Sequence, residues 1–220
     1  MPAADTCRSG PEAKLRIMPS PDVSHRTAPA AAVVCRRLWP GDAAEVRAHF
    51  LRLDPEARAS RFMAALTDAA VAAHAARAMR APGLMFGVFV GGALRGLGEL
   101  RPLGPEGRTG RFGARAEGAL AVERGFRRAG HGVLLLERLA EAARNRGVRE
   151  LHLRCLPMNG AMRRLAGRLG AEVRLRDGES EAALRLTRPT PLSLWREGVE
   201  GLIDLGLAAA TPPTSLPRAA

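Results

Sequence analysis

The sequence predicts a single α/β (α+β) domain in which a sheet is flanked by helices. Residues 84–90 and 94–100 are strand-like, and the two glycines between them are typical of a β-hairpin. Residues 116–147 have the pattern of a strand, a glycine-rich turn and an amphipathic helix. A chain of 220 residues has room for one such domain with a proper core and loose ends.

The remaining elements follow from the period of the apolar residues and from capping residues. Asp42, with Glu45 three positions later, matches a capping box, and Thr67 predicts a second helix start. The helix after the glycine-rich turn has a predicted inner face of Val133, Leu136, Leu139, Ala140 and Ala143. The expected order is βααβββαβαββ, with strands in residues 31–38, 84–90, 94–100, 116–123, 150–156 and twice within 171–187, and helices beginning near residues 42, 67, 131 and 159.

The two ends differ in composition from this region, which spans residues 31–187. Residues 1–30 are rich in Pro, Ala and Ser and show no periodicity, so we expect a disordered extension. Residues 188–220 are Pro-rich, and we expect them to be partly helical because residues 194–207 form one amphipathic stretch that can dock as an extra helix.

The cysteines and the lengths of the apolar runs restrict the classes of protein to which the sequence can belong. Cys7, Cys35 and Cys155 are odd in number and form no Cys-x-x-Cys pair, so we expect no disulfide framework, no metal site and a cytoplasmic setting. The N-terminus lacks a signal-peptide core, and no apolar run is long enough to span a membrane.

The net charge of +12 would favour an anionic partner, but Lys14 is the only lysine, and such a skew toward arginine is equally typical of compositional bias. Neither nucleic acid nor a membrane is therefore the expected partner, while oligomer formation stays open.

The glycine-rich turn has the chemistry of a phosphate-binding loop. It reads Arg127-Arg128-Ala129-Gly130-His131-Gly132 and lies between a strand and a helix. Glycines let successive backbone N–H groups turn toward one point at the positive end of a helix, where a pyrophosphate can accept several hydrogen bonds. A tight turn alone would also explain an isolated Gly-x-Gly.

A second motif lies at residues 159–171, where Asn159 begins a predicted helix that ends at a glycine before the next strand. Together the two motifs resemble motifs A and B of the GNAT superfamily of N-acetyltransferases. Arg127, Gly130 and Gly132 match motif A, Gln/Arg-x-x-Gly-x-Gly/Ala. The resemblance covers about residues 31–187 and implies a central, mixed, mostly antiparallel twisted sheet of six to seven strands flanked by helices.

The resemblance also implies a co-substrate, acetyl-CoA or another acyl-CoA, and the residues that bind it. The backbone amides of the loop would hold its pyrophosphate, while the backbone near Leu120 to Val122 and the side chain of Asn159 would contact its pantetheine arm. We expect the His131 side chain to point to solvent. The implied cofactor-binding residues are Leu120, Ala121, Val122, Arg127, Arg128, Ala129, Gly130, His131, Gly132, Val133 and Asn159.

Residues 54–62, Asp-Pro-Glu-Ala-Arg-Ala-Ser-Arg-Phe, are similar to the Pro-Glu-x-Arg-x-x-Arg-Phe segment of bacterial protein-lysine acetyltransferase domains. Protein lysine is therefore one possible acceptor, and a small-molecule amine is the other. A helix-initiating Asp-Pro-Glu with two solvated arginines explains the segment equally well.

Acyl transfer from a thioester to an amine needs a neutral amine, so a general base is required. Glu117 is the candidate, because it lies ten residues before Arg127, the spacing at which the resembling lysine acetyltransferases carry a glutamate. An edge-strand charge paired with Arg115 is the alternative. Glu99, on the preceding strand, is the reserve base, acting through a water.

The sequence departs from the family at the general acid. Many members carry a Tyr on the motif B helix, but this chain has no Tyr, and Ala166 stands at the expected position. Cys155 or water are possible substitutes. The missing acid keeps a second function open, a catalytically degenerate domain that binds or senses acyl-CoA.

Overall fold

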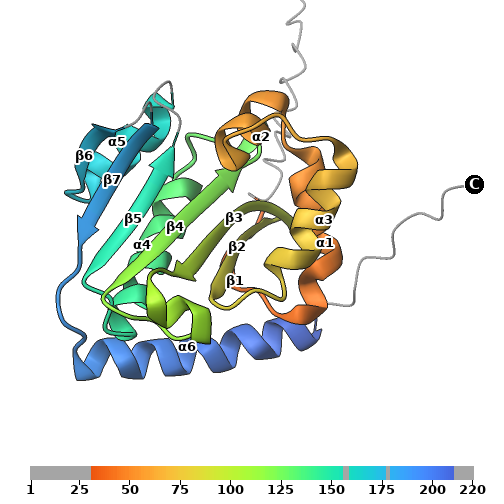
Figure 1. Ribbon diagram of the computed structural model, residues 1–220. Helices are drawn as coiled ribbons and strands as arrows, with labels where there is room; N and C mark the ends of the chain where they lie inside the picture. Colours follow the sequence, from red (N-terminus) through yellow and green to blue (C-terminus); the bar gives the residue numbers. More distant parts are fainter. Residues whose placement is uncertain (1–30, 156–158, 177–178, 211–220) are drawn as a thin grey trace, which may run out of the picture. The chain divides into compact units, whose positions relative to one another are not determined.

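The computed structural model describes residues 31–155, 159–176 and 179–210, and the expected disorder of residues 1–30 lies outside this range. Seven strands form one sheet in the order β1-β2-β3-β4-β5-β7-β6 (Figure 1). All neighbouring strands are antiparallel except β4 and β5, which confirms the predicted mixed sheet. The strands are β1 (Val33–Arg37), β2 (Leu84–Val90), β3 (Ala93–Pro102), β4 (Arg115–Val122), β5 (Glu150–Cys155), β6 (Glu172–Arg176) and β7 (Glu179–Arg185).

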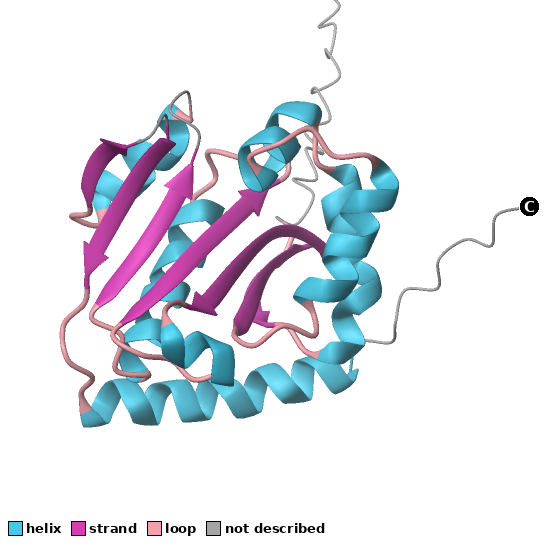
Figure 2. Cartoon of the chain, viewed as in Figure 1, coloured by secondary structure: helices cyan, strands magenta, loops and turns pink. Residues whose placement is uncertain are grey.

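Helices cover both faces of the sheet (Figure 2). Helices α1 and α3 pack on β2 and β3 around Phe50, Val71 and Leu97, whereas α4 and α5 pack on the opposite face around Leu136, Leu139 and residues of β5 and β7. Because side chains alternate along a strand, β3 contributes Leu97 to the first core and Leu100 to the second. The helices are α1 (Ala43–Arg52), α2 (Pro55–Phe62), α3 (Asp68–Ala78), α4 (His131–Asn145), α5 (Gly160–Arg168) and α6 (Pro191–Ala210), with short 3-10 turns at Pro40–Asp42, Pro105–Thr109 and Arg124–Phe126.

Two local predictions about the region between β1 and β2 are wrong. Three helices lie there instead of two, because Asp54 accepts a hydrogen bond from the Ala57 amide (3.0 Å) and Pro55 starts the separate helix α2. Asp42 precedes α1 but forms no capping hydrogen bond. Its carboxylate is instead buried against the Arg36 guanidinium, with distances of 2.7 and 3.0 Å, since β1 brings that arginine within reach.

Strands β4 and β5 separate part of the way along their length. They pair only from Arg115–Glu150 to Gly118–Leu153, and beyond that point β4 pairs only with β3 while β5 continues beside β7. A Cβ on Gly118 would lie 2.7 Å from Leu153 Cδ2, so glycine is needed where the two strands separate. Figure 1 shows the ends of β4 and β5 diverging. A gap between backbone edges therefore opens directly after Glu117 and Gly118.

Helix α6 contains the predicted helical stretch 194–207 and packs through its polar side. The contacts are Arg138 with Glu200, Arg196 with Glu141 (2.6 Å), Arg146 with Glu197 (2.6 Å), Asn145 with Ser193 (2.7 Å), and the Arg37 amide with Asp204 (2.8 Å). Several of its large apolar side chains are exposed, including Leu192, Trp195 and Leu202. No helix in the described part of the chain is long and apolar enough to cross a membrane.

Candidate active site

The loop between β4 and α4 presents a set of free backbone donors. Arg128 and Gly130 have positive φ angles of 65° and 82°, which turns the chain sharply into α4. The first helical amide to find a backbone acceptor is that of Leu134, which donates to the Gly130 carbonyl (3.0 Å). Within the described residues, the amides of residues 128–133 donate to no backbone carbonyl. A phosphate group bound at a helix N-terminus accepts hydrogen bonds from free amides of this kind.

Glycine leaves this loop open to a ligand. An added Cβ at Gly130 would contact nothing within 4 Å, so no protein atom fills the space in front of it. At Gly132 the nearest atom to such a Cβ would be Leu165 Cδ2, at 3.4 Å. The predicted phosphate loop therefore has both the donors and the room that a pyrophosphate needs.

Arg127 stabilises the loop through hydrogen bonds of its side chain. Its guanidinium donates to the Val122 carbonyl (3.1 Å) and to Asp54 Oδ2 (2.8 Å), so it joins the end of β4 to the start of α2. Nε and Nη2 of Arg127 are thus directed at protein groups, and the backbone amides of residues 128–133 are further donors that no described backbone carbonyl occupies.

Glu123 anchors the other side of the same turn. Its carboxylate accepts hydrogen bonds from Arg52 (2.9 Å) and Arg95 (2.9 Å) and lies 3.0 Å from His49 Nδ1. Burial by itself would raise the pKa of Glu123, but His49, Arg95 and Arg52 together lower it. The pKa of His49 is lowered because burial outweighs the opposing effect of Glu123. The loop is thus held by an ionised carboxylate.

The prediction that the His131 side chain points to solvent is wrong. His131 is buried, and its Nδ1 lies 2.9 Å from the Phe126 carbonyl. Because a carbonyl only accepts, Nδ1 is the donor, and this hydrogen bond joins the two ends of the loop. The backbone amide of His131 remains among the free donors.

Asn159 caps α5 and also reaches α2. Its Oδ1 accepts from the Met162 amide (3.0 Å), and its Nδ2 donates to Ser60 Oγ (2.5 Å). The cap was predictable from local sequence, whereas the contact with Ser60 joins residues 99 positions apart. The side chain of Asn159 therefore connects the two helices that stand at the open ends of β4 and β5.

Glu117 lies where β4 and β5 separate. It is half-buried, pairs with Arg101 of β3 and His152 of β5 in the sheet register, and makes no hydrogen bond or ion pair with the described residues. The alternative ion pair with Arg115 is thus not formed in the described structure. Neither carboxylate oxygen of Glu117 is occupied by a side chain of the described residues.

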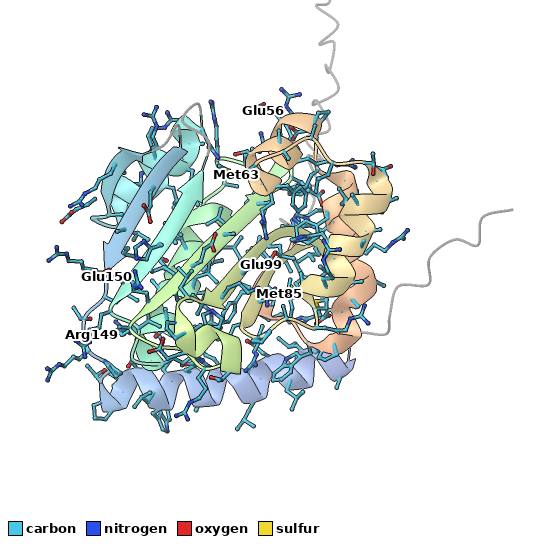
Figure 3. The ribbon with its side chains drawn as sticks, viewed as in Figure 1. Glu56, Met63, Met85, Glu99, Arg149 and Glu150 are labelled. Atoms are coloured by element: carbon cyan, nitrogen blue, oxygen red, sulfur yellow. The ribbon has the colours of Figure 1, made fainter. Side chains whose placement is uncertain are left out.

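Glu99 has different surroundings. It is buried on β3, next to Met85 on the side of the sheet that faces α3 (Figure 3). Arg61 donates to one oxygen and Arg101 donates twice to the other, at 2.7 and 3.1 Å, while His74 Nε2 lies 3.8 Å away. Burial would raise the pKa of Glu99, but Arg61, His74 and Arg101 lower it strongly. Glu99 is therefore held as an ionised partner of two arginines.

The position at which the family carries a Tyr is closed in this chain. Ala166 is fully buried in the core between α5 and the sheet. The side chain of Cys155, one of the predicted substitutes, lies outside the described set, and no group of three His, Cys, Asp or Glu in the described residues can hold a metal ion.

Sequence reasoning missed the role of α2. Asp54 contacts Arg127 of the phosphate loop, Ser60 contacts Asn159, and Arg61 contacts Glu99. Neither Arg58 nor Arg61 is solvated as a helix-surface arginine would be. The similarity of residues 54–62 to a known segment was the only signal for this role, since none of the three partners is close in sequence.

Known proteins resemble the chain in both sequence and fold. The sequence profile of the Acetyltransferase (GNAT) family matches residues 56–171, more than half of the 220 residues. The GNAT domain of S. lividans PAT superposes with a TM-score of 0.60 at 21% identity, covering 71% of this chain and 97% of that one.

Two further structures share the fold. YncA, a putative acetyltransferase from Salmonella typhimurium solved with acetyl-CoA, has a TM-score of 0.56 and 16% identity, covering 73% of this chain and 97% of its own. A phosphinothricin acetyltransferase from Sinorhizobium meliloti, in complex with acetyl-CoA, has a TM-score of 0.55 and 16% identity, covering 72% and 94%. No curated protein sequence matches the chain. The family match, the sheet and the loop agree, and the chain belongs to the GNAT family of acetyltransferases.

Proposed function

We propose that the protein is an N-acetyltransferase that moves an acetyl group from acetyl-CoA to an amine, with Glu117 as the general base. The observation that carries the proposal is the position of Glu117, unpaired within the described structure, where β4 and β5 separate beside a loop of free amides. Acetyl-CoA accompanies two structural neighbours of this fold.

The residues present suit acetyl-CoA. The amides of residues 128–133 would bind its pyrophosphate, and the edge of β4 at Leu120 to Val122, which β5 does not pair with and where the Val122 carbonyl already accepts from Arg127, would pair with the amide groups of its pantetheine arm. Asn159 stands near the other side of the gap with its amide already positioned by Ser60.

Glu117 would remove a proton from the acceptor ammonium, because only a neutral amine has the lone pair that attacks the thioester. The lowered pKa of Glu99 makes that carboxylate a weaker proton acceptor, and both its oxygens are taken by arginines. We therefore assign the base to Glu117 and a supporting role to Glu99. Water is the proposed carrier of the proton that the leaving thiolate receives.

Protein lysine is the first acceptor to test, because residues 54–62 resemble the corresponding segment of bacterial protein-lysine acetyltransferases and form the helix α2 beside the gap. A small amine is the other acceptor class, and a screen that includes both distinguishes them.

The first experiment measures acetyl-CoA binding by calorimetry for Gly130→Asp and Gly130→Asn. Both residues tolerate the left-handed backbone at this position, so the pair differs mainly in charge. We expect Asp to weaken binding at least tenfold more than Asn, because a carboxylate repels the pyrophosphate. Equal affinities for the two variants would contradict a phosphate site in this loop.

The second measurement is amine-dependent release of CoA. Glu117→Gln should reduce kcat by about 100-fold or more while leaving acetyl-CoA binding unchanged. Glu172→Gln, an exposed carboxylate on β6, is the matched control and should retain activity. Acetyl-CoA binding without turnover on any acceptor would favour the acyl-CoA-sensing alternative.

A further inference from the structure

The part of the sheet beside Glu117 carries a histidine that the proposed chemistry does not yet use. We infer that His152, held by Glu181, receives the proton that Glu117 removes from the acceptor and passes it toward solvent. This inference rests on the proposed acetyl transfer with Glu117 as base.

His152 is the cross-strand neighbour of Glu117. The two residues are paired in the register of β4 and β5, one row before the strands separate, and neighbouring strands lie about 4.8 Å apart. Paired residues project from the same face of a sheet. Leu151 and Leu153 pack toward α4, so His152 and Glu117 project from the opposite face.

That face is uncovered over β5 and β7. Helices α1 and α3 pack over β2 and β3, and Figure 1 shows no helix in front of β5 and β7. An acceptor approaching the gap from this side meets Glu117 and His152 together. When it binds, the acceptor itself shields Glu117 from bulk water, which makes a second route for the proton useful.

The contacts of His152 orient its ring. Nδ1 lies 2.7 Å from Glu181 Oε1, and because an ionised carboxylate only accepts, Nδ1 is the donor. Nε2 lies 3.5 Å from Glu150 Oε2 and is a buried ring nitrogen with no hydrogen-bond partner among the described residues. A buried polar nitrogen usually has a hydrogen-bond partner, either a protein group or a water. A water joining Nε2 to Glu117 would supply both the missing partner and the path of the proton.

The reaction needs this outlet. The acceptor enters as an ammonium ion and loses one proton to Glu117 before its nitrogen forms a bond to the acetyl carbon. As the carbon–sulfur bond breaks, the electron pair goes to sulfur, and the second N–H proton balances the thiol that leaves. One proton per turnover is therefore released, and Glu117 must lose it before it can deprotonate the next acceptor.

Charged groups face His152 from its own strand and from both neighbouring strands. Glu117 faces it from β4, Glu181 from β7 and Glu150 from its own strand. The other charged residues in the same and adjacent rows are Arg101 on β3, Arg115 on β4, Arg154 on β5, Arg185 on β7, and Glu172 and Arg174 on β6. The charged groups with described distances to the ring, Glu181 and Glu150, are both carboxylates, which can accept hydrogen bonds from its nitrogens.

The test compares kcat across pH for the wild type and for His152→Gln and His152→Ala, with amine-dependent CoA release as the assay. Glutamine can still donate to Glu181 but cannot carry a proton, so we expect a roughly tenfold lower kcat and a pH profile of kcat that differs from that of the wild type. Free imidazole added to His152→Ala should restore at least half of the lost rate. Acetyl-CoA affinity and melting temperature should remain unchanged, and Glu172→Gln is the control on the same face.

The outcomes separate the inference from the proposed function. If Glu117→Gln loses turnover but His152→Gln keeps the wild-type kcat and pH profile, the role of His152 is overturned and the proposed function stands. If imidazole gives no rescue and the melting temperature of both His152 variants falls, His152 is structural and the inference is overturned. If the wild type binds acetyl-CoA but turns over no acceptor, the proposed function is overturned and the inference with it.

Discussion

At the scale of single residues, Glu99 shows how partners decide the chemistry of a carboxylate. Glu99 and Glu117 lie on adjacent strands. Two arginines form ion pairs with Glu99, whereas no described residue forms a hydrogen bond or an ion pair with Glu117. An isolated buried carboxylate would tend to protonate, but a close guanidinium favours the ionised form. The same residue type is therefore part of an ion cluster at one position and is the proposed general base at the other.

Glu99→Gln should reveal this ion cluster through the pH dependence of stability. The pKa of Glu99 is lowered by Arg61, His74 and Arg101 against the effect of burial, so its stabilising contribution is complete above its ordinary value of 4.5 and is lost as the pH falls. We expect the variant to be about 3 kcal/mol less stable at pH 7, with the difference shrinking below pH 4.5. Urea unfolding at several pH values measures it, and parallel curves for the two proteins would contradict the prediction.

At the scale of elements, α2 connects parts of the site that are distant in the chain. Asp54 at its start contacts Arg127, Ser60 contacts Asn159, and Arg61 contacts Glu99. The helix is only eight residues long and would not be stable by itself in water. Its order therefore depends on the same contacts that position the site.

Ser60→Ala should separate this positioning from helix capping. The change removes the hydrogen bond to Asn159 Nδ2 but leaves the cap on the Met162 amide, so we expect weaker acetyl-CoA binding with a loss of stability of only about 1 kcal/mol. Asn159→Ala removes both contacts and should cost about 1 kcal/mol more through the lost cap. Calorimetry and thermal unfolding of the two variants measure these effects, and unchanged affinity in both would exclude Asn159 from the binding site.

At the scale of the whole molecule, α6 joins β1 and α4 through polar contacts instead of an apolar face. Asp204 is buried at the centre of this contact, where it accepts from the Arg37 amide and lies 3.6 Å from Arg138. Burial raises the pKa of Asp204, and the Arg37 amide, Arg138 and Arg36 only partly offset this effect. Helix α6 is thus attached through a carboxylate whose charged form is destabilised by burial.

Replacing Asp204 should show that its hydrogen bond matters more than its charge. A raised pKa means that stability is complete below the ordinary value of the carboxyl and declines as the pH rises through the raised one. Asp204→Asn keeps an oxygen for the Arg37 amide, so we expect it to match or exceed wild-type stability at pH 7 and to lose this advantage in acid. Asp204→Ala leaves the amide unpaired and should cost about 1–3 kcal/mol. Melting temperatures from pH 4 to 8 test both, and a large loss in the Asn variant would contradict the account.

The sequence by itself determined most of the elements and the phosphate loop. Gly130 adopts a left-handed conformation at the start of α4, Gly118 fits where two leucines pack, and Asn159 caps α5. The conformation of Gly130 and the Asn159 cap depend on residues within a few positions of one another, whereas Gly118 meets leucines of another strand. Local propensity and apolar period were sufficient to predict the strands and the helices, and the mixed sheet followed from the resemblance to the GNAT family.

Only the tertiary structure decided which side chains meet across the site. Asp42 pairs with Arg36 instead of capping a helix, His131 turns inward to a carbonyl, and α2 reaches three distant partners. Likewise the register of β4 and β5 places His152 beside Glu117, although the two residues are far apart in the chain. Strand register and helix packing bring such residues together, and a one-residue shift of either strand would place their side chains on opposite faces of the sheet.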